Sequence, residues 1–419
     1  MRAVVLLGAG ASADADIPTT LEMTNKVIES IREPRQRRLL EFIRLTLGAY
    51  LAQQDPLEGA TFGEAVSFAT DVDVERLFAS VDLLVSRNEQ AWRPFVAAWH
   101  PGLDAFTPPQ RVRRQQLNLN LHSVAQALSS AIESASRHNT SPMRIQTQGI
   151  QRALGDLIQQ AFENALPPDV TSLLREARTE MLRSLFNLLA ITDASHVAYL
   201  QPLVALATEQ AQLTIGTLNY DRAIENVGDL AGIACDTGIN DAWQGDQRLT
   251  WKADAPIRLM KLHGSIDWVT EGRHANSGEL PLTRIRKVTP DEKSRYESPA
   301  VVFGEAGKLR SDGPFLELLL EWATALREAN RLLIIGYSFR DDHINEVIAR
   351  WFVSDEDRRI VVLSPSRPAG KRSSFANAVA QAMEPIRAQR GQPEREPRIA
   401  HVAGRTADVL ESAIEAVKS

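Results

Sequence analysis

One stretch near the N-terminus constrains the fold more than any other part of the chain. It runs Val4-Val5-Leu6-Leu7-Gly8-Ala9-Gly10-Ala11-Ser12. A short apolar run broken by two glycines predicts a buried parallel strand that enters a tight turn. Beyond that turn, Pro18 and two threonines predict a helix that starts near Thr19 or Thr20. The chain therefore opens with a strand-turn-helix unit, which is typical of α/β folds.

The turn has the chemistry of an anion site. Gly8 and Gly10 allow a close approach that a Cβ would block, and a following helix offers free N–H groups and a positive dipole end. The third glycine of the usual dinucleotide fingerprint is missing, so the pair is equally consistent with ordinary turn chemistry. Motifs further along the chain have to decide between these two interpretations.

The α/β pattern returns in the second half of the chain. Apolar runs predict strands at 213–217, 233–235, 257–262, 331–335, 359–363 and 399–402. Helices are expected from residues 222, 314, about 341 and 406. Right-handed crossovers make such strands parallel. The fold class expected is α/β, with a Rossmann-like doubly wound parallel sheet.

A long segment between these two parts has a different character. Apolar residues recur at spacings of three and four in 37–52, 74–87, 115–137 and 171–191. A chain of 419 residues is too long for one small core. We therefore expect a domain formed by 1–32 and 211–419, interrupted by a large all-helical insertion at 33–210.

Composition excludes several classes of protein. A net charge of −6 argues against an open nucleic-acid surface. Cys235 is the single cysteine, which excludes an internal disulfide and any multi-cysteine zinc site. The N-terminus lacks a signal-peptide pattern, and no apolar run is long enough to span a bilayer. A cytoplasmic protein that binds no membrane is expected.

Polar residues follow four of the predicted strands, namely Asn219, His263, Ser338 and Ser364. Because the carboxyl ends of parallel strands share one edge of a sheet, these side chains should meet there. Each has a purely structural alternative: Asn219 or Ser338 with Asp341 could cap a helix, and His263 could be a turn residue. Their coincidence at one edge favours a nucleotide site.

Four motifs in this order resemble the signature of the sirtuin (Sir2) family. They are Gly8-Ala9-Gly10-Ala11-Ser12 with Ile17-Pro18, Thr217-Leu218-Asn219-Tyr220-Asp221, Lys261-Leu262-His263-Gly264-Ser265, and Gly336-Tyr337-Ser338. The resemblance covers the opening unit and the second half of the chain and leaves the insertion unmatched. The run 335–339, followed by 341–344, is closer to Sir2-like proteins of bacterial anti-phage defence than to protein deacylases.

The resemblance implies that NAD is the substrate and that the bond between nicotinamide and ribose is broken. It implies two catalytic residues: Asn219 positions the nicotinamide ribose or the attacking water, and His263 is the base near the ribose hydroxyls. Asp221 lies beside the nicotinamide carboxamide. The cofactor phosphates and the adenosine end are expected to contact Gly8, Ala9, Gly10, Ser12, Gly336, Ser338 and Ser364.

Departures from the family pattern narrow the expected reaction. Deacylases carry a four-cysteine zinc module, which one cysteine cannot build, so no zinc is expected. Leu218 stands where glutamine is usual, Ser364 stands where asparagine is common, and nothing obvious grips an acyl-lysine peptide. Water is then the expected acceptor. The hypothesis is an NAD+ hydrolase that yields nicotinamide and ADP-ribose and acts in anti-phage defence by depleting NAD.

Such an activity requires an off state, and the helical insertion is the expected place for it. The resemblance implies a homo-oligomer and a separately encoded HerA-type hexameric ATPase as partner, with a short Argonaute complex as the alternative. Two other functions stay open: a module that binds NAD or ADP-ribose without cleaving it, and a protein deacylase or ADP-ribosyltransferase.

Overall fold

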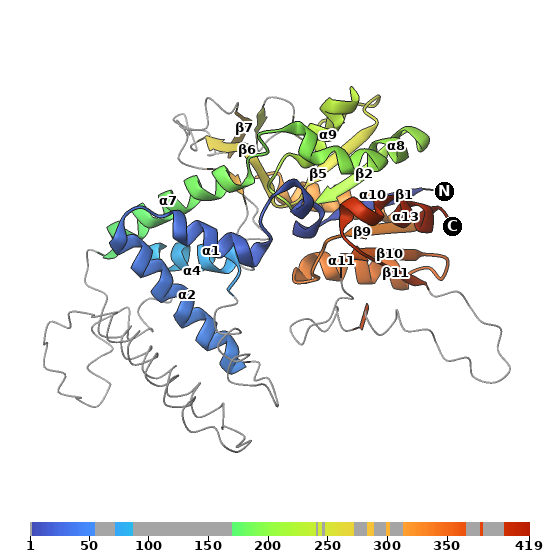
Figure 1. Ribbon diagram of the computed structural model, residues 1–419. Coiled ribbons are helices and arrows are strands. Elements are labelled where there is room, and N and C mark those ends of the chain that lie inside the picture. Colours follow the sequence, from blue (N-terminus) through green and yellow to red (C-terminus); the bar gives the residue numbers. More distant parts are fainter. Residues whose placement is uncertain are drawn as a thin grey trace, which may run out of the picture. The chain divides into compact units, whose positions relative to one another are not determined.

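The computed structural model describes ten ranges of the chain, with gaps between them. They are 2–54, 72–86, 170–239, 242–244, 248–271, 283–288, 299–301, 313–365, 378–379 and 398–419. The chain forms two compact units, one made of Met1–Thr19 with Phe186–Ser419 and the other of Thr20–Leu185 (Figure 1). The first unit holds the sheet, and the second is helical where it is described.

A seven-stranded parallel sheet forms the centre of the first unit. Its spatial order is β11-β10-β9-β1-β2-β5-β3. The strands are β1 (Ala3–Leu7), β2 (Leu213–Thr217), β3 (Cys235–Asp236), β5 (Ile257–Lys261), β9 (Arg331–Ile335), β10 (Arg359–Ser364) and β11 (Ile399–Ala403). The predicted Rossmann-like doubly wound sheet is confirmed, and the opening strand lies at its middle.

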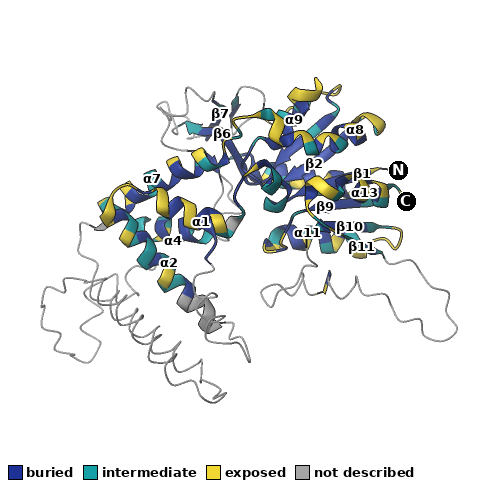
Figure 2. Ribbon diagram, in the orientation of Figure 1, coloured by how far each residue is buried: buried dark blue, intermediate teal, exposed yellow. Residues whose placement is uncertain are grey.

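Helices cover both faces of this sheet. The strands carry apolar side chains on both faces, so each face packs its own layer of helices. One face packs against η7 (Ala194–Leu200), α8 (Gln201–Glu209), α9 (Ala223–Ala231) and α13 (Thr406–Lys418). The other packs against α10 (Phe315–Arg327) and α11 (Asp342–Val353). Figure 2 shows the central strands β1 and β2 dark blue and exposed residues of the helices yellow.

The order of the strands reverses beside β1, and this places the ligand-binding edge. The connection from β1 to β2 ends in α8 on one face, and the connection from β9 to β10 contains α11 on the other, although β1 and β9 are neighbours. Ligands of open α/β sheets bind outside the carboxyl ends of strands at such a switch point. The loops that follow β1, β2, β5 and β9 all start at this edge.

A small antiparallel sheet was not expected from the sequence. Its spatial order is β4-β7-β6-β8, and it consists of β4 (Ala242–Gln244), β6 (Gly264–Glu271), β7 (Arg284–Lys287) and β8 (Pro299–Val301). The first six residues of β6 are all buried, so the sequence lacks the alternation that marks a half-exposed strand. Strand β4 lies between the predicted strands 233–235 and 257–262, in a stretch where the sequence predicted no strand.

The second unit contains helices in its described residues. These are α1 (Thr20–Ser30), α2 (Pro34–Gln54), α4 (Val74–Ser86) and most of α7 (Val170–Leu189). Its buried apolar side chains include Leu40, Leu77, Phe78 and Met181. The helix expected at 115–137 lies outside the described residues. Two segments that the sequence assigned to the insertion, η7 and α8, pack with the sheet instead.

Among the described helices, none combines the length and apolar character needed to cross a membrane.

The domain bounds 1–32 with 211–419, and 33–210, stay a prediction. Helix α1 begins at Thr20, where the sequence placed it.

Two glycine turns lie against each other at the switch point. The amide of Gly8 donates to the carbonyl of Ile335, and that of Gly10 donates to the carbonyl of Gly336, both at 2.9 Å. A Cβ on Gly8 would lie 2.6 Å from Tyr337 Cα, and one on Gly10 would lie 2.8 Å from Gly336 Cα. The backbones touch because neither turn carries side chains there.

Replacing Gly336 with alanine tests this contact. Gly336 has φ of +62°, and a Cβ there would lie 2.3 Å from the amide nitrogen of Ala11. A matched control is Gly232→Ala, because Gly232 has φ of +67° but no atom within 4 Å of an added Cβ. The control should lower the free energy of unfolding by about 1–2 kcal/mol from the left-handed backbone alone.

Gly336→Ala should cost about 1–3 kcal/mol more than the control, because its Cβ also forces two backbones apart. Urea unfolding of both variants measures the difference. Equal losses in the two variants would contradict the packing argument.

Candidate functional site

The glycine turn after β1 uses most of its own amides. Ala11 N donates to Gly8 O and Ser12 N to Ala9 O, while Gly8 and Gly10 donate to the β9 side. The residues form two short 3₁₀ turns, Ala9–Ala11 and Ala13–Ala15. The sequence argument used a helix dipole at this point, but α1 starts at Thr20 in the other unit. The turn therefore offers an anion the half-exposed backbone of Ala9 and Gly10.

Asn219 is joined directly to this turn. It follows β2, and its Nδ2 donates to Gly8 O and to Ser12 Oγ, both at 3.0 Å. The backbone amide of Asn219 donates to Thr217 Oγ1 at 3.1 Å. Ser12 is 2% exposed and Asn219 is 9% exposed. Both side-chain donors of Asn219 are thus used inside the protein, and Oδ1 is its acceptor.

Asp221 shapes the start of α9. Its Oδ1 accepts from the amide of Ala223 at 2.9 Å, and the residue is 5% exposed. The side chain thereby binds an amide at the helix start, as carboxylates at helix N-termini do. Its placement beside a nicotinamide carboxamide stays a prediction.

His263 pairs with Asp341, a carboxylate that the sequence analysis considered only as a possible helix cap. Its Nε2 lies 2.9 Å from Asp341 Oδ2, and both residues are buried. Asp341 Oδ1 also caps α11 by accepting from the amides of His343 and Ile344. The ring of Tyr220 lies 6.4 Å from the imidazole, measured between centroids. The imidazole is therefore held between the turn after β2 and the start of α11.

The loop from Gly336 to Asp341 is held by a local network. Tyr337 Oη donates to Asn345 Oδ1 at 3.0 Å and accepts from the amide of Asp341 at 3.1 Å. Asn345 Nδ2 donates to the carbonyl of Phe339 at 2.9 Å. Ser338 is exposed on this loop. A loop fixed by its buried side chains presents Ser338 to solvent at the sheet edge.

Ser364 ends β10 one strand further out. Its Oγ lies 3.1 Å from His401 Nε2 on β11. Gly336 N donates to the carbonyl of Leu363, which precedes Ser364, at 2.9 Å. Ser364 thus lies next to the β9 turn through the backbone, and its side chain contacts β11.

Two residues outside the motifs support the glycine turn. Tyr199 of η7 donates its hydroxyl to the carbonyl of Ala11 at 2.7 Å. Burial, together with the charges of Asp221 and Asp14, raises the pKa of this phenol, which keeps it protonated as a donor. Asp14, in the loop after β1, accepts from the amide of Ala407 at 2.8 Å. It therefore fastens the loop after β1 to the start of α13.

The structure thus brings most of the predicted residues to one edge and adds two. Asn219 contacts Gly8 and Ser12 directly, and Gly10 contacts Gly336. Asp341 and Lys261 were not among the residues that the sequence predicted for the site. The signals were present as a carboxylate three residues after Ser338 and a lysine inside an apolar strand.

Comparison with known proteins follows this geometry. Residues 213–383 match the family model described as a SIR2-like domain. The match contains Asn219, His263, Ser338 and Ser364 and stops short of the glycine turn after β1. No curated protein matches the chain.

Two solved structures show low similarity. One is a mutant of a Sir2 homologue in complex with 2′-O-acetyl ADP ribose, 12% identical, covering 60% of this chain and 78% of the other, with a TM-score of 0.33. The other comes from work on the mechanism and regulation of Sir2 enzymes, 14% identical, covering 59% and 78%, with a TM-score of 0.30. The fold assignment rests on the sheet topology itself. Residues 213–383 are therefore similar to SIR2-like domains.

Proposed function

We propose that this chain is an NAD+ hydrolase that cleaves the bond between nicotinamide and ribose, yielding nicotinamide, ADP-ribose and a proton. One observation carries the proposal. Asn219 and His263 follow the neighbouring strands β2 and β5 at the edge beside the glycine turn, and each is fixed by a second residue, Ser12 and Asp341 respectively. The SIR2-like domain supports NAD as the substrate.

Hydrolysis of the bond between nicotinamide and ribose requires a water molecule, a general base and a pocket wall that excludes bulk solvent. Cleavage of a glycosidic bond passes through a state with oxocarbenium character, which a positioned water then captures. Asn219 Oδ1 can accept a hydrogen bond from that water or from a ribose hydroxyl, because both of its amide donors are already used. His263, oriented by Asp341, takes the proton from a ribose hydroxyl or from the water.

The pyrophosphate of NAD is assigned to the glycine turn. Ala9 and Gly10 are half-exposed there, whereas Ser12 is buried against Asn219. We therefore assign Ser12 to holding Asn219 and the exposed backbone of the turn to the phosphates. Ser338 and Ser364 are the side chains proposed for the ribose and adenosine end, with Gly336 allowing the two turns to touch.

The biological role proposed is depletion of NAD in anti-phage defence, under the control of other proteins. The resemblance of the run 335–339, followed by 341–344, to defence proteins supports this role. A second copy of the chain and a HerA-type ATPase are the proposed partners, and the predicted helical insertion at 33–210 is the proposed docking element. Co-purification with neighbouring gene products tests it, and recovery of neither an ATPase nor an Argonaute would contradict it.

His263→Ala and Asn219→Ala test the catalytic assignment. Loss of a general base lowers the rate by about 10²- to 10⁴-fold, so His263→Ala should bring NAD consumption near background. Asn219→Ala should have a comparable effect, because the water or ribose loses its acceptor. Chromatography of nicotinamide and ADP-ribose measures both, and circular dichroism checks the fold.

The control is His196→Ala, which removes a histidine that is 46% exposed and contacts Asp16 rather than the proposed site. It should keep full turnover. NAD that binds but persists with wild-type protein, also after the proposed partners are added, would overturn the hydrolase and leave a binding module.

Asp341→Asn separates the charge of this residue from its capping role. Asparagine keeps Oδ1 as the acceptor for the amides of His343 and Ile344, so α11 should remain intact. Its Nδ2 then faces Nε2 of His263 and cannot accept a hydrogen bond from it. Turnover should fall by up to about 10²-fold. This loss is smaller than that expected for His263→Ala, because the general base itself is still present.

A double variant, His263→Ala with Asp341→Asn, should be no slower than His263→Ala alone, because Asp341 acts through the histidine. Additive losses in initial-rate measurements would show that Asp341 acts independently of His263.

A further inference from the structure

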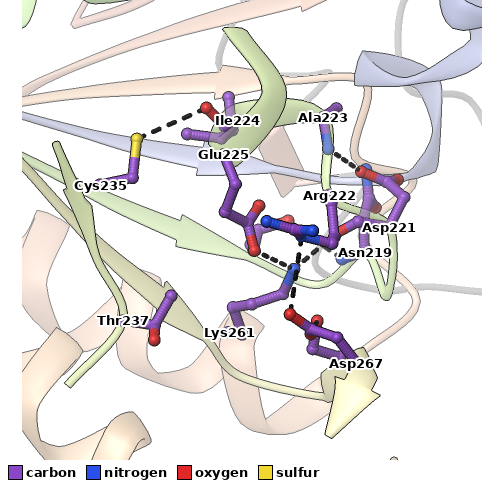
Figure 3. Close-up of polar contacts among 12 residues, drawn as sticks. Asn219, Asp221, Arg222, Ala223, Ile224, Glu225, Cys235, Thr237, Lys261 and Asp267 are labelled. Atoms are coloured by element: carbon purple, nitrogen blue, oxygen red, sulfur yellow. Dashed lines mark hydrogen bonds and ion pairs between the residues drawn. The ribbon is translucent and has the colours of Figure 1, made fainter. Parts of the chain in front are cut away.

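A lysine is completely buried beneath the candidate site. Lys261, the last residue of β5, is 0% exposed. An ammonium group taken out of water is costly unless it is paired and hydrogen-bonded. Figure 3 shows its amine pointing toward the turn after β2 and the start of α9. The proposed function assigns a role to His263, which follows β5, and none to Lys261.

Both acceptors of Lys261 come from one short segment. Its Nζ donates to the main-chain carbonyl of Asp221 at 2.5 Å and to Glu225 Oε1 at 3.0 Å. Asp221 precedes α9, and Glu225 lies in the first turn of that helix. A single cation therefore fastens the carboxyl end of β5 to the start of α9.

Further charges surround this pair. Arg222 Nε lies 3.6 Å from Asp267 Oδ2 (Figure 3). Ser265 Oγ donates to Asp267 Oδ1. Burial raises the pKa of Asp267, but Lys261, the Ser265 hydroxyl, Arg222 and Lys287 outweigh it and hold that pKa below its ordinary value. Burial lowers the pKa of Lys287, against the charges of Asp267 and Glu225.

Lys261 and its acceptor Asp221 lie close in sequence to the two proposed catalytic residues. Lys261 lies two residues before His263, and Asp221 lies two residues after Asn219. Backbone bonds continue the pairing beyond the strands: Leu262 N donates to Thr217 O and Ile266 N to Tyr220 O, both at 2.9 Å. Those backbone bonds join the ends of β2 and β5. The side chain of Lys261 adds a bond to the turn after β2, through the carbonyl of Asp221.

We propose that Lys261, with Glu225, is a positioning residue that fixes Asn219 relative to His263. The cation binds the carbonyl of Asp221 and thereby sets the path of the chain that carries Asn219. This inference rests on the proposed function for its kinetic consequence, and its structural consequence is independent of that function. Small displacements of reacting groups are expensive, since about 1 Å can cost 10²-fold in rate.

The test removes the pair without leaving a buried charge. Lys261→Met combined with Glu225→Gln is nearly isosteric and neutral. The matched control is Lys418→Met with Glu209→Gln, another lysine–glutamate pair of the same unit, 2.8 Å apart and partly exposed between α13 and α8. Both double variants are made in the full chain and checked by thermal melting.

The expected kinetic result is a fall in kcat by about 10- to 10²-fold for the buried pair, with KM for NAD within about threefold. Hydrogen exchange measured by mass spectrometry should accelerate at 218–225. The control pair should keep kcat and this exchange pattern. If the buried double variant does not fold, Lys261→Arg keeps the charge, misplaces the donor and is judged by the same two measurements.

The outcomes separate the two proposals. A buried-pair variant with wild-type kcat and wild-type exchange at 218–225 overturns the role of Lys261. If the wild-type chain fails to hydrolyse NAD, the proposed function fails. In that case faster exchange at 218–225 still supports Lys261 as the residue that fixes the turn, and unchanged exchange overturns it.

Discussion

The rest of the site depends on the contact between the glycine turns that follow β1 and β9. Gly10 donates to Gly336 across a gap that no Cβ could occupy, and this contact holds the carboxyl ends of the two central strands together. The two strands send their helices to opposite faces of the sheet, so the contact lies where such folds bind ligands. Asn219 is then joined to the same turn through Gly8 and Ser12.

Two buried charged groups support the proposed catalytic residues in different ways. Asp341 pairs with the imidazole of His263 while capping α11, so one carboxylate joins a helix to a side chain of a different strand end. Lys261 holds the carbonyl of Asp221 and so acts on the backbone near Asn219. Burying each charge costs free energy, and hydrogen bonds to neighbouring groups offset this cost. The site is thereby built from fixed backbone and side-chain contacts at the ends of β2, β5 and β9.

Much of the fold followed from local patterns. The apolar runs at 213–217, 331–335 and 359–363 are strands in the structure, and α1 starts at Thr20 as its capping pattern indicated. The small antiparallel sheet escaped because β6 is buried on both faces and lacks alternation. The sequence did not predict that two 3₁₀ turns, Ala9–Ala11 and Ala13–Ala15, separate the glycine turn from the start of α1 at Thr20.

By itself, the sequence determined the strand order along the chain, the polar residues at the strand ends and the resemblance that suggested NAD chemistry. These are properties of residue type and spacing, which local physics translates into strands and turns. The tertiary structure decided which of those residues touch. The pairing of His263 with Asp341 spans 78 positions, and that of Lys261 with Glu225 spans 36. Such partners are set by strand order and helix packing, because burial requires a charge to find its counterpart across the fold, wherever the chain brings it.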